Sequence, residues 1–264
     1  MINKISVAII CKNEESRIGQ CLESVRWADE IVVVDSGSTD KTLDVVAEYT
    51  DKVFVNSVWP GFGRQKMLAV DKASNDWVLA LDSDEVVSEK LRDEIIEHIS
   101  VADEKTVFRV NRLTFFCNKF IYHSGWHPDK IVRLFNKKYY QYNEALVHES
   151  VVCKGAKKID LKGKLFHYTF DTLEVYMDKR NGYAKMWADS QYKKGRKASA
   201  LEVIVRTLFA FIRHYFIRLG FLDGYHGFLI SVIQMQYTFN KYNFLKFKYV
   251  LSDAESIKIK DESE

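Results

Sequence analysis

The N-terminal part of the chain alternates short apolar runs with amphipathic segments. In the segment 18–25, apolar residues recur with helical spacing, and Asn13 precedes it as a predicted N-cap. Short apolar runs bounded by polar residues are typical of buried strands. Alternating strands and helices of this length predict a parallel sheet with crossover helices, an α/β fold. The predicted strands are Ile5–Ile10, Glu30–Val34, Val53–Val55 and Trp77–Leu81.

The alternation of strands and helices changes after Ser88, which is a predicted N-cap for a helix over Glu89–Ile99. Further strands are expected up to residue 170, and the chain then becomes helical in pattern. We therefore expect a sheet domain over residues 1–170, a helical extension over 171–250 and a polar tail over 251–264. The later strands are predicted at Thr106–Phe116, Lys130–Phe135, Leu146–Cys153 and Lys164–Tyr168.

Composition narrows the class of protein. Hydrophobic residues make up 47% of the 264 residues and charged residues 28%, which is typical of a globular chain. A net charge of +3 is too balanced to indicate nucleic-acid binding. The four cysteines lack a CxxC spacing, and the N-terminus lacks a signal-peptide pattern, so we expect a reduced, cytoplasmic protein.

Polar residues gather where three predicted strands end. The clusters are Lys12–Glu14, Asp35–Asp40 and Asp82–Glu85. In parallel α/β sheets, ligands bind beyond the carboxyl ends of the strands, so these clusters predict one site at one sheet edge. Carboxylate oxygens such as those of Asp82 and Asp84 suit Mg²⁺ or Mn²⁺, which also bind substrate phosphates.

The C-terminal part carries an excess of positive charge. Between Lys179 and Arg218 there are ten Lys and Arg residues and two acidic ones, which indicates an anionic partner. The apolar segment Leu201–Leu219 is interrupted by arginines and is too charged to span a bilayer. Two interpretations remain open: a helix lying in the interface of an anionic bilayer, or a helix packed on the sheet domain. A homodimer contact is a third use of these helices.

Three segments together resemble the family 2 glycosyltransferases, which have the GT-A fold. They are SVAIICKNE (Ser6–Glu14), IVVVDSGSTDKT (Ile31–Thr42) and LALDSDE (Leu79–Glu85). The resemblance implies a Rossmann-like, mixed and mainly parallel sheet flanked by helices. The segments Arg133–Asn136, Val147–Ser150 and Gly220–Phe228 are similar to a bacterial branch of glucosyltransferases that extend the inner core of lipopolysaccharide or lipooligosaccharide.

The resemblance also implies roles for individual residues. A UDP-sugar would lie against Ala8, Ile10, Glu14, Asp35, Asp82 and Ser83, with Arg64, Gln65 or Lys66 near the diphosphate; of these three, Lys66 is our choice. Asp84 would bind Mg²⁺ or Mn²⁺ directly, and Asp82 would contact the metal or the ribose. The family's catalytic base is usually in a Glu-Asp motif, for which the best match here is His148-Glu149. We therefore assign Glu149 as the base and keep His148 as an alternative base or metal ligand.

The acceptor would lie beside a polar, aromatic loop. Trp126 is a predicted sugar-stacking platform, because an aromatic face offers apolar area with a polar edge. His127 and Asp129 share that loop, and Arg133 follows in an apolar strand from which it points either to solvent or into the site. His148 completes the expected acceptor residues.

The sequence thus predicts an inverting, metal-dependent glycosyltransferase. We expect it to move a hexose, glucose from UDP-glucose, to a core sugar of a lipid-linked saccharide at the inner face of the membrane. Another polysaccharide or protein acceptor is an alternative. A nucleotidyltransferase is disfavoured because no Gly-rich phosphate loop follows the first strand. A nucleotide-binding, membrane-peripheral protein without catalysis is the non-enzymatic alternative.

Overall fold

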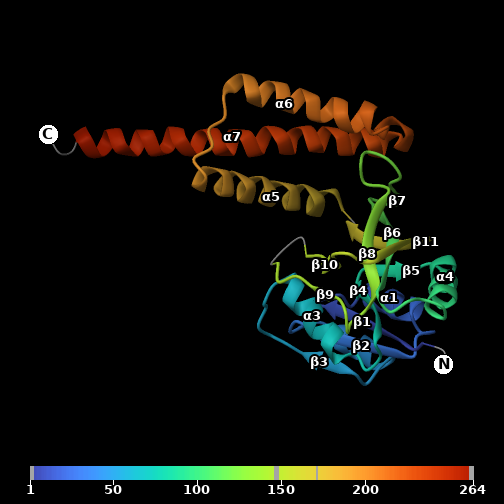
Figure 1. The fold of residues 1–264 in the computed structure, drawn as a ribbon. Coiled ribbons are helices and arrows are strands. Elements are labelled where there is room, and N and C mark those ends of the chain that lie inside the picture. The colour runs from blue at the N-terminus through green and yellow to red at the C-terminus, as the bar shows by residue number, and fades with distance from the viewer. Residues whose placement is uncertain (1–2, 146–148, 171, 262–264) are drawn as a thin grey trace. The chain divides into compact units, whose positions relative to one another are not determined.

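The computed structural model describes residues 3–145, 149–170 and 172–261, and the chain forms two compact units (Figure 1). Unit 1 contains the chain up to Thr114 together with Pro128–Thr169. Unit 2 contains Phe115–His127 and the chain from Phe170 onward. The hairpin Phe115–His127 thus belongs to the helical unit, although the sequence pattern places it within the sheet domain over 1–170.

The first half of the sheet in unit 1 is parallel. It runs in the order β3-β2-β1-β4, and crossover helices connect the strands along the chain. The strands are β1 (Ile5–Cys11), β2 (Glu30–Asp35), β3 (Val53–Val55) and β4 (Trp77–Asp82). The crossover helices are α1 (Ile18–Ser24), α2 (Thr42–Ala47) and α3 (Phe62–Lys72).

The order places a topological switch point between β1 and β4. From β1 the chain winds outward to β2 and β3, and then returns to the other side of β1 as β4. In open α/β sheets such a reversal leaves a crevice beyond the carboxyl ends of the strands, where ligands bind.

The second half of the sheet is antiparallel. The strand β8 pairs antiparallel with β4, and the order continues β8-β6-β11-β5. These elements are β5 (Glu85–Val87), α4 (Glu89–Ile99), β6 (Thr106–Phe116), β8 (Asp129–Asn136) and β11 (Lys157–Phe170). Short strands complete the set: β7 (Lys119–Phe120), which pairs with the end of β6, and the pair β9 (Gln141–Tyr142) and β10 (Val151–Val152). The fold class is confirmed as α/β with a mixed sheet and a C-terminal helical extension.

The core explains why the first strands are apolar throughout. Side chains alternate between the two faces of a strand, so Val7 and Ile9 pack in one cluster and Ala8 and Ile10 in another. The first cluster includes residues of α1 and α4, and the second includes residues of α3. Because both faces of the parallel strands are covered, each strand is a continuous apolar run rather than an alternating one.

Apart from the hairpin Phe115–His127, unit 2 is built of helices. Its first two helices begin at Leu173 and Ala200. Thr172 and Ser199 cap them by accepting the backbone N–H groups of Val175 and Glu202. A β-carbon on Gly227 would lie 1.7 Å from the carbonyl oxygen of Gly220, so only glycine fits there. None of the described helices is long and apolar enough to cross a membrane. The elements are α5 (Leu173–Lys193), α6 (Ala200–Ile212), the π-helical turn η1 (Arg213–Ile217), the 3₁₀ turn η2 (Gly220–Asp223) and α7 (Tyr225–Asp261).

Three predicted boundaries differ from the structure. The strand expected over Lys164–Tyr168 is the longer β11, which begins at Lys157 and ends at Phe170. The strand expected over Leu146–Cys153 is the shorter β10 in the described part of that segment. The tail expected from residue 251 is helical as far as Asp261, because α7 continues through it.

Candidate functional site

The polar clusters predicted at the strand ends do meet. Cys11 at the end of β1 is in register with Asp35 at the end of β2, and Ile10 is in register with Asp82 at the end of β4. The two acidic residues therefore flank the end of the central strand, at the switch point of the sheet.

Hydrogen bonds lock the loops after β1 and β2 together. The backbone N–H of Thr39 donates to the side-chain oxygen of Asn13 at 2.8 Å, and that of Glu14 donates to Thr42 Oγ1 at 2.7 Å. Asn13 has a φ of 53°, a left-handed conformation that asparagine tolerates. The prediction of Asn13 as a helix N-cap was therefore wrong: α1 begins only at Ile18.

The residues expected to hold the nucleoside differ in accessibility. Ala8 and Ile10 are 2% and 6% exposed and belong to the core. Asp35 is fully buried, and its Oδ1 accepts the N–H groups of Gly37 and Ser38, both at 2.8 Å. The carboxylate of Asp35 thus shapes the turn after β2.

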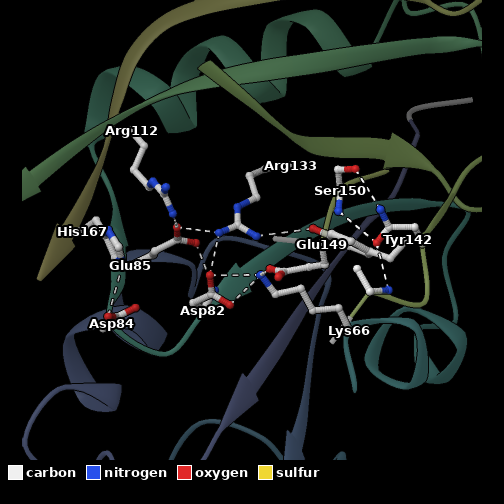
Figure 2. A network of polar contacts seen from close by, with 12 residues as sticks. Lys66, Asp82, Asp84, Glu85, Arg112, Arg133, Tyr142, Glu149, Ser150 and His167 are labelled. Atoms are coloured by element: carbon white, nitrogen blue, oxygen red, sulfur yellow. Dashed lines mark hydrogen bonds and ion pairs between the residues drawn. The ribbon is translucent and has the colours of Figure 1, made fainter. Parts of the chain in front are cut away.

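Lys66 is a buried ammonium between two carboxylates. Its side chain is 2% exposed, and Nζ lies 2.8 Å from Asp82 Oδ1 and 2.7 Å from Glu149 Oε1 (Figure 2). Burial and the nearby Arg133 would lower the pKa of Lys66, but the carboxylates of Asp82 and Glu149 and the phenol group of Tyr142 outweigh them and raise it. Lys66 therefore stays charged, and it joins α3 to β4 and to the chain before β10.

Arg133 is a second buried cation, on the other side of Asp82. Its guanidinium is buried, and one nitrogen lies 2.6 Å from Asp82 Oδ2 and 2.7 Å from Glu85 Oε1 (Figure 2). The two carboxylates outweigh the effect of burial and raise the pKa of Arg133 well above its usual value. Of the two orientations left open by the sequence, the structure shows the inward one.

Asp82 therefore has a cation at each oxygen. Burial would raise its pKa, but Lys66 and Arg133 together hold it well below its usual value. A metal ion at Asp82 would therefore compete with two cations for the carboxylate oxygens. We call Glu149, Lys66, Asp82, Arg133 and Glu85 the ion-pair network.

Asp84 lies outside the ion-pair network, and its partner is a residue that the sequence analysis missed. His167 Nε2 lies 3.3 Å from Asp84 Oδ2, and both side chains are largely buried (Figure 2). His167 Nδ1 is buried without a hydrogen bond to any described residue. Sheet register explains the pairing, because His167 in β11 is opposite Glu85 in β5. The available signal was a histidine within the predicted strand Lys164–Tyr168.

The Asp84–His167 pair fits a divalent cation in part. It offers one carboxylate and one imidazole, and no group of three or more His, Cys, Asp or Glu side chains in the described ranges is arranged for a metal. The remaining ligands would have to be phosphate oxygens and water, as is usual for Mg²⁺ in nucleotide sites. Ser83, between the two aspartates, is 6% exposed.

The proposed base, Glu149, is in contact with the rest of the site through Lys66, and its side chain is 16% exposed. His148, its neighbour and alternative, lies outside the described residues. Nearby, Arg64 binds Glu144 at 2.8 Å in a pair that is more than half exposed. Gln65 is buried and donates to Ser36 Oγ at 2.9 Å. Of the three candidates for the diphosphate, Lys66 is the one that contacts Asp82 and Glu149.

The expected acceptor residues are divided between the units. Asp129 and Arg133 belong to unit 1, where Asp129 binds Arg112 at 2.8 Å. Trp126 and His127 belong to unit 2. Trp126, the predicted sugar-stacking platform, is half-buried, with ring contacts to Phe116 and other aromatic residues.

Comparison with known proteins gives a consistent result. A family model described as glycosyl transferase family 2 matches residues 6–159. The chain is 33% identical to an uncharacterized glycosyltransferase of Rickettsia typhi, over 88% of this chain and 83% of the relative. It is 30% identical to the lipopolysaccharide core biosynthesis glycosyltransferase LpsC of Rhizobium meliloti, over 89% of each. The crystal structure of TarS from S. aureus aligns with a TM-score of 0.44 at 18% identity, over 93% of this chain and 55% of TarS.

Proposed function

Because the chain belongs to glycosyl transferase family 2, we propose that it transfers a hexose from a UDP-sugar, with inversion, to a core sugar of lipopolysaccharide or lipooligosaccharide. The glycosyltransferase activity itself follows from the family. The core-sugar acceptor is supported by the similarity to LpsC over most of both chains. Glucose is the hexose we expect, and the cytoplasmic face of the membrane is the place where the acceptor would be met.

One observation carries this proposal. Lys66 Nζ contacts both Asp82 at the end of β4 and Glu149, which is 83 residues from Lys66 along the chain. The proposed base is thereby held at the same sheet edge as the acidic residues of the switch point. Donor-side and acceptor-side carboxylates in one small region are what a displacement at a sugar carbon requires.

Asp84 and His167 would hold the metal ion. Bound there with the donor diphosphate, Mg²⁺ or Mn²⁺ would act as a Lewis acid that stabilises the charge of the leaving UDP. The ion-pair network keeps the carboxylate of Asp82 fixed beside Asp84, so that Asp82 can accept a hydrogen bond from the donor without rotating.

Glu149 would accept the proton of the attacking hydroxyl. The acceptor oxygen forms a bond to the anomeric carbon from the face opposite the diphosphate, the bond from that carbon to the phosphate oxygen breaks, and UDP leaves. Lys66 would orient Glu149 through their ion pair at 2.7 Å.

The test is transfer to heptose-terminated lipopolysaccharide from a panel of UDP-sugars, with and without Mn²⁺. We expect UDP-glucose to be used and Glu149→Gln to lower kcat by about 10²–10⁴-fold, the usual contribution of a general base. Glu144→Gln is the matched control, because Glu144 lies in the same connection between β9 and β10 but forms an exposed ion pair with Arg64.

Three results would contradict the proposal. Wild-type turnover in Glu149→Gln would remove Glu149 as the base. The control variant is Asp76→Asn, which changes an aspartate just before β4. If Asp84→Asn depends on Mn²⁺ to the same extent as this control, Asp84 is not a metal ligand. Release of pyrophosphate instead of UDP would show a nucleotidyltransferase.

A further inference from the structure

The loops that follow the first two strands offer no aromatic ring to a nucleoside. Residues 12–17 after β1 and residues 36–41 after β2 contain no Phe, Tyr, Trp or His. The predicted nucleoside residues Ala8, Ile10 and Asp35 are themselves buried. A nucleotide base has two flat faces, and proteins that bind bases commonly stack an aromatic side chain on one of them. A stacking partner would therefore come from another loop at this sheet edge.

The loop between β3 and α3 carries two exposed aromatic rings. Trp59 is 47% exposed, and Phe62, the first residue of α3, is 41% exposed. Their ring centroids are 4.8 Å apart, and the ring planes meet at 86°. An edge-to-face contact of this kind occupies the face of only one ring, so the two residues keep a face for a third ring. We call Trp59 and Phe62 the aromatic pair.

The start of this loop is attached to the end of β2. The backbone N–H of Asn56 donates to the carbonyl oxygen of Asp35 at 2.8 Å. Ser57 lies against the turn after β2, since a β-carbon on Gly37 would be 3.4 Å from Ser57 Oγ. Trp59 follows two residues later. The aromatic pair is thus carried by a segment that packs on the turn shaped by Asp35.

The other end of the loop continues into the helix that carries Lys66. Phe62 and Lys66 are four residues apart in α3, so their side chains are neighbours on one side of the helix. Lys66 binds Asp82 at 2.8 Å, and Gln65 Nε2 donates to Ser36 Oγ at 2.9 Å. The loop is therefore attached to the end of β2 and, through α3, to the end of β4.

Two constraints restrict the backbone around the aromatic pair. Pro60 directly follows Trp59 and favours an extended backbone at Trp59. At the start of α3, the N–H of Gly63 donates to the carbonyl oxygen of Ala145 at 3.0 Å, and a β-carbon on Gly63 would lie 2.0 Å from the carbonyl oxygen of Asn143. A ring on a fixed backbone loses little freedom when a ligand binds, so more of the stacking energy contributes to affinity.

Two substrate rings have a suitable flat face. The sugar ring of an acceptor has an apolar face of C–H groups, and the base of a donor nucleotide has a π face. The base is favoured because the loop is bonded to Asp35, the residue expected to hold the uridine part, and because no aromatic residue directly follows β1 or β2.

We propose that Trp59 stacks on the base of the donor nucleotide, with Phe62 supporting the indole ring. Trp59 would then be the uracil-stacking residue of the UDP-sugar site, an assignment that rests on the proposed donor. Asp35 has a positioning role in this arrangement, because its carbonyl oxygen holds the loop of Trp59 while its carboxylate holds the turn after β2.

The test is calorimetric titration of the full-length protein with UDP and Mg²⁺. Pyrophosphate with Mg²⁺ serves as the ligand that lacks a base. Trp59→Ala should weaken UDP binding by about tenfold or more, because the base loses its aromatic partner, and should leave pyrophosphate binding unchanged. Trp59→Phe keeps an aromatic face and should retain most of the affinity for UDP.

Tryptophan fluorescence gives an independent measurement. Trp59 is the most exposed of the five tryptophans. A uracil ring stacked on its indole should quench the emission of the wild type, whereas pyrophosphate should not. The quenching should be lost in Trp59→Phe, although UDP still binds to that variant.

Tyr139→Ala is the matched control. Tyr139 is an aromatic residue of unit 1 with a similar exposure, 44%, but it lies between β8 and β9. The control should bind UDP as the wild type does. Circular dichroism melting curves check that every variant is folded.

The stacking of Trp59 on the base would be ruled out by any of three results. The first is a folded Trp59→Ala protein whose UDP affinity and transfer kinetics equal those of the wild type. The second is an equal loss of affinity for UDP and for pyrophosphate, which would show a general disturbance of the site. The third is unchanged UDP affinity with a raised KM for the acceptor, which would assign Trp59 to the acceptor sugar.

These results are distinguishable from a failure of the proposed donor. In all three the wild type still binds UDP, so the UDP-sugar donor stands and only the role of Trp59 is overturned. A folded wild type that does not bind UDP would overturn the donor and the stacking together.

Discussion

The ion-pair network of unit 1 and a group of cations in unit 2 stabilise charge in opposite ways. We call this group, Arg180, Arg196, Arg206 and Lys241, the cationic cluster. In the network, cations and carboxylates alternate, and the central groups are nearly inaccessible: Lys66 is 2% exposed and Glu85 is fully buried. In the cluster, cations gather over aromatic rings with Glu202 as the one carboxylate that contacts them among the described side chains. The first arrangement pairs each cation with carboxylates, whereas the second leaves Arg180 and Lys241 without a carboxylate partner among the described side chains.

This difference indicates how well each region tolerates the loss of a charge. A buried ion pair that loses one member leaves an uncompensated charge in a medium of low dielectric, which is strongly destabilising. A half-exposed cation beside other cations loses little when it is neutralised, because water already screens it and repulsion disappears. Stability should therefore depend far more on the network than on the cluster.

The largest effect is expected for Arg133→Met. It removes the cation between Asp82 and Glu85 and should lower the free energy of unfolding by about 3–5 kcal/mol. Urea denaturation followed by circular dichroism measures it. Arg109→Met, which breaks a half-exposed pair with Asp160, is the matched control and should lose far less. Equal losses in the two variants would contradict the distinction between the network and surface pairs.

His167→Gln should come next, as an effect on metal use rather than on stability. Replacing a metal ligand or its orienting group typically costs about 10–100-fold in metal affinity. The half-saturating Mn²⁺ concentration for UDP-sugar hydrolysis should rise by that factor. His98→Gln in α4 controls for loss of a histidine elsewhere in unit 1. An unchanged Mn²⁺ titration would show that the Asp84–His167 contact is an ion pair only.

Glu30 offers an intermediate case at the opposite end of the parallel strands. Burial would raise its pKa, but hydrogen bonds from Lys52, Ser6 and Ser74 lower it to about 2, from 4.5. Its lowered pKa stabilises the fold above pH 4.5, and the benefit is lost as the pH falls toward 2. Glu30→Gln should cost roughly 1–3 kcal/mol at neutral pH, and the cost should shrink over that range. Urea denaturation at several pH values tests this, and a constant cost would contradict it.

The smallest effect, and the one of opposite sign, is expected for Lys241→Met. The substitution keeps the packing of the side chain and removes a cation that faces three arginines. Thermal unfolding should show a stability unchanged or raised by up to about 0.5 kcal/mol. A loss comparable to that of Arg133→Met would mean that the cluster has an internal counterion, and the contrast between the two regions would fail.

The sequence by itself determined much of this protein through local pattern. Apolar runs placed β1 to β4, and Ser88 was correctly predicted as the cap of α4. Because parallel strands end at a common edge, the pattern of strands and helices was enough to assign Asp35 and Asp82 to one site. These features depend on neighbouring residues or on a rule that holds for every sheet of this class.

Only the tertiary structure decided which charges meet. Lys66 and Glu149 are far apart in sequence, and so are Asp84 and His167; the register of β11 against β5 and the packing of α3 bring them together. Local pattern likewise gave Asn13 the wrong role, since its partner Thr39 comes from another loop. A pairing between distant side chains is set by the register and packing of whole elements, which no short window of sequence encodes. The exposed apolar residues of α6 follow the same reasoning: their helical spacing is visible in the sequence, but their exposure is decided by which side of α6 the other helices cover. They are Leu201, Val205, Leu208 and Ile212.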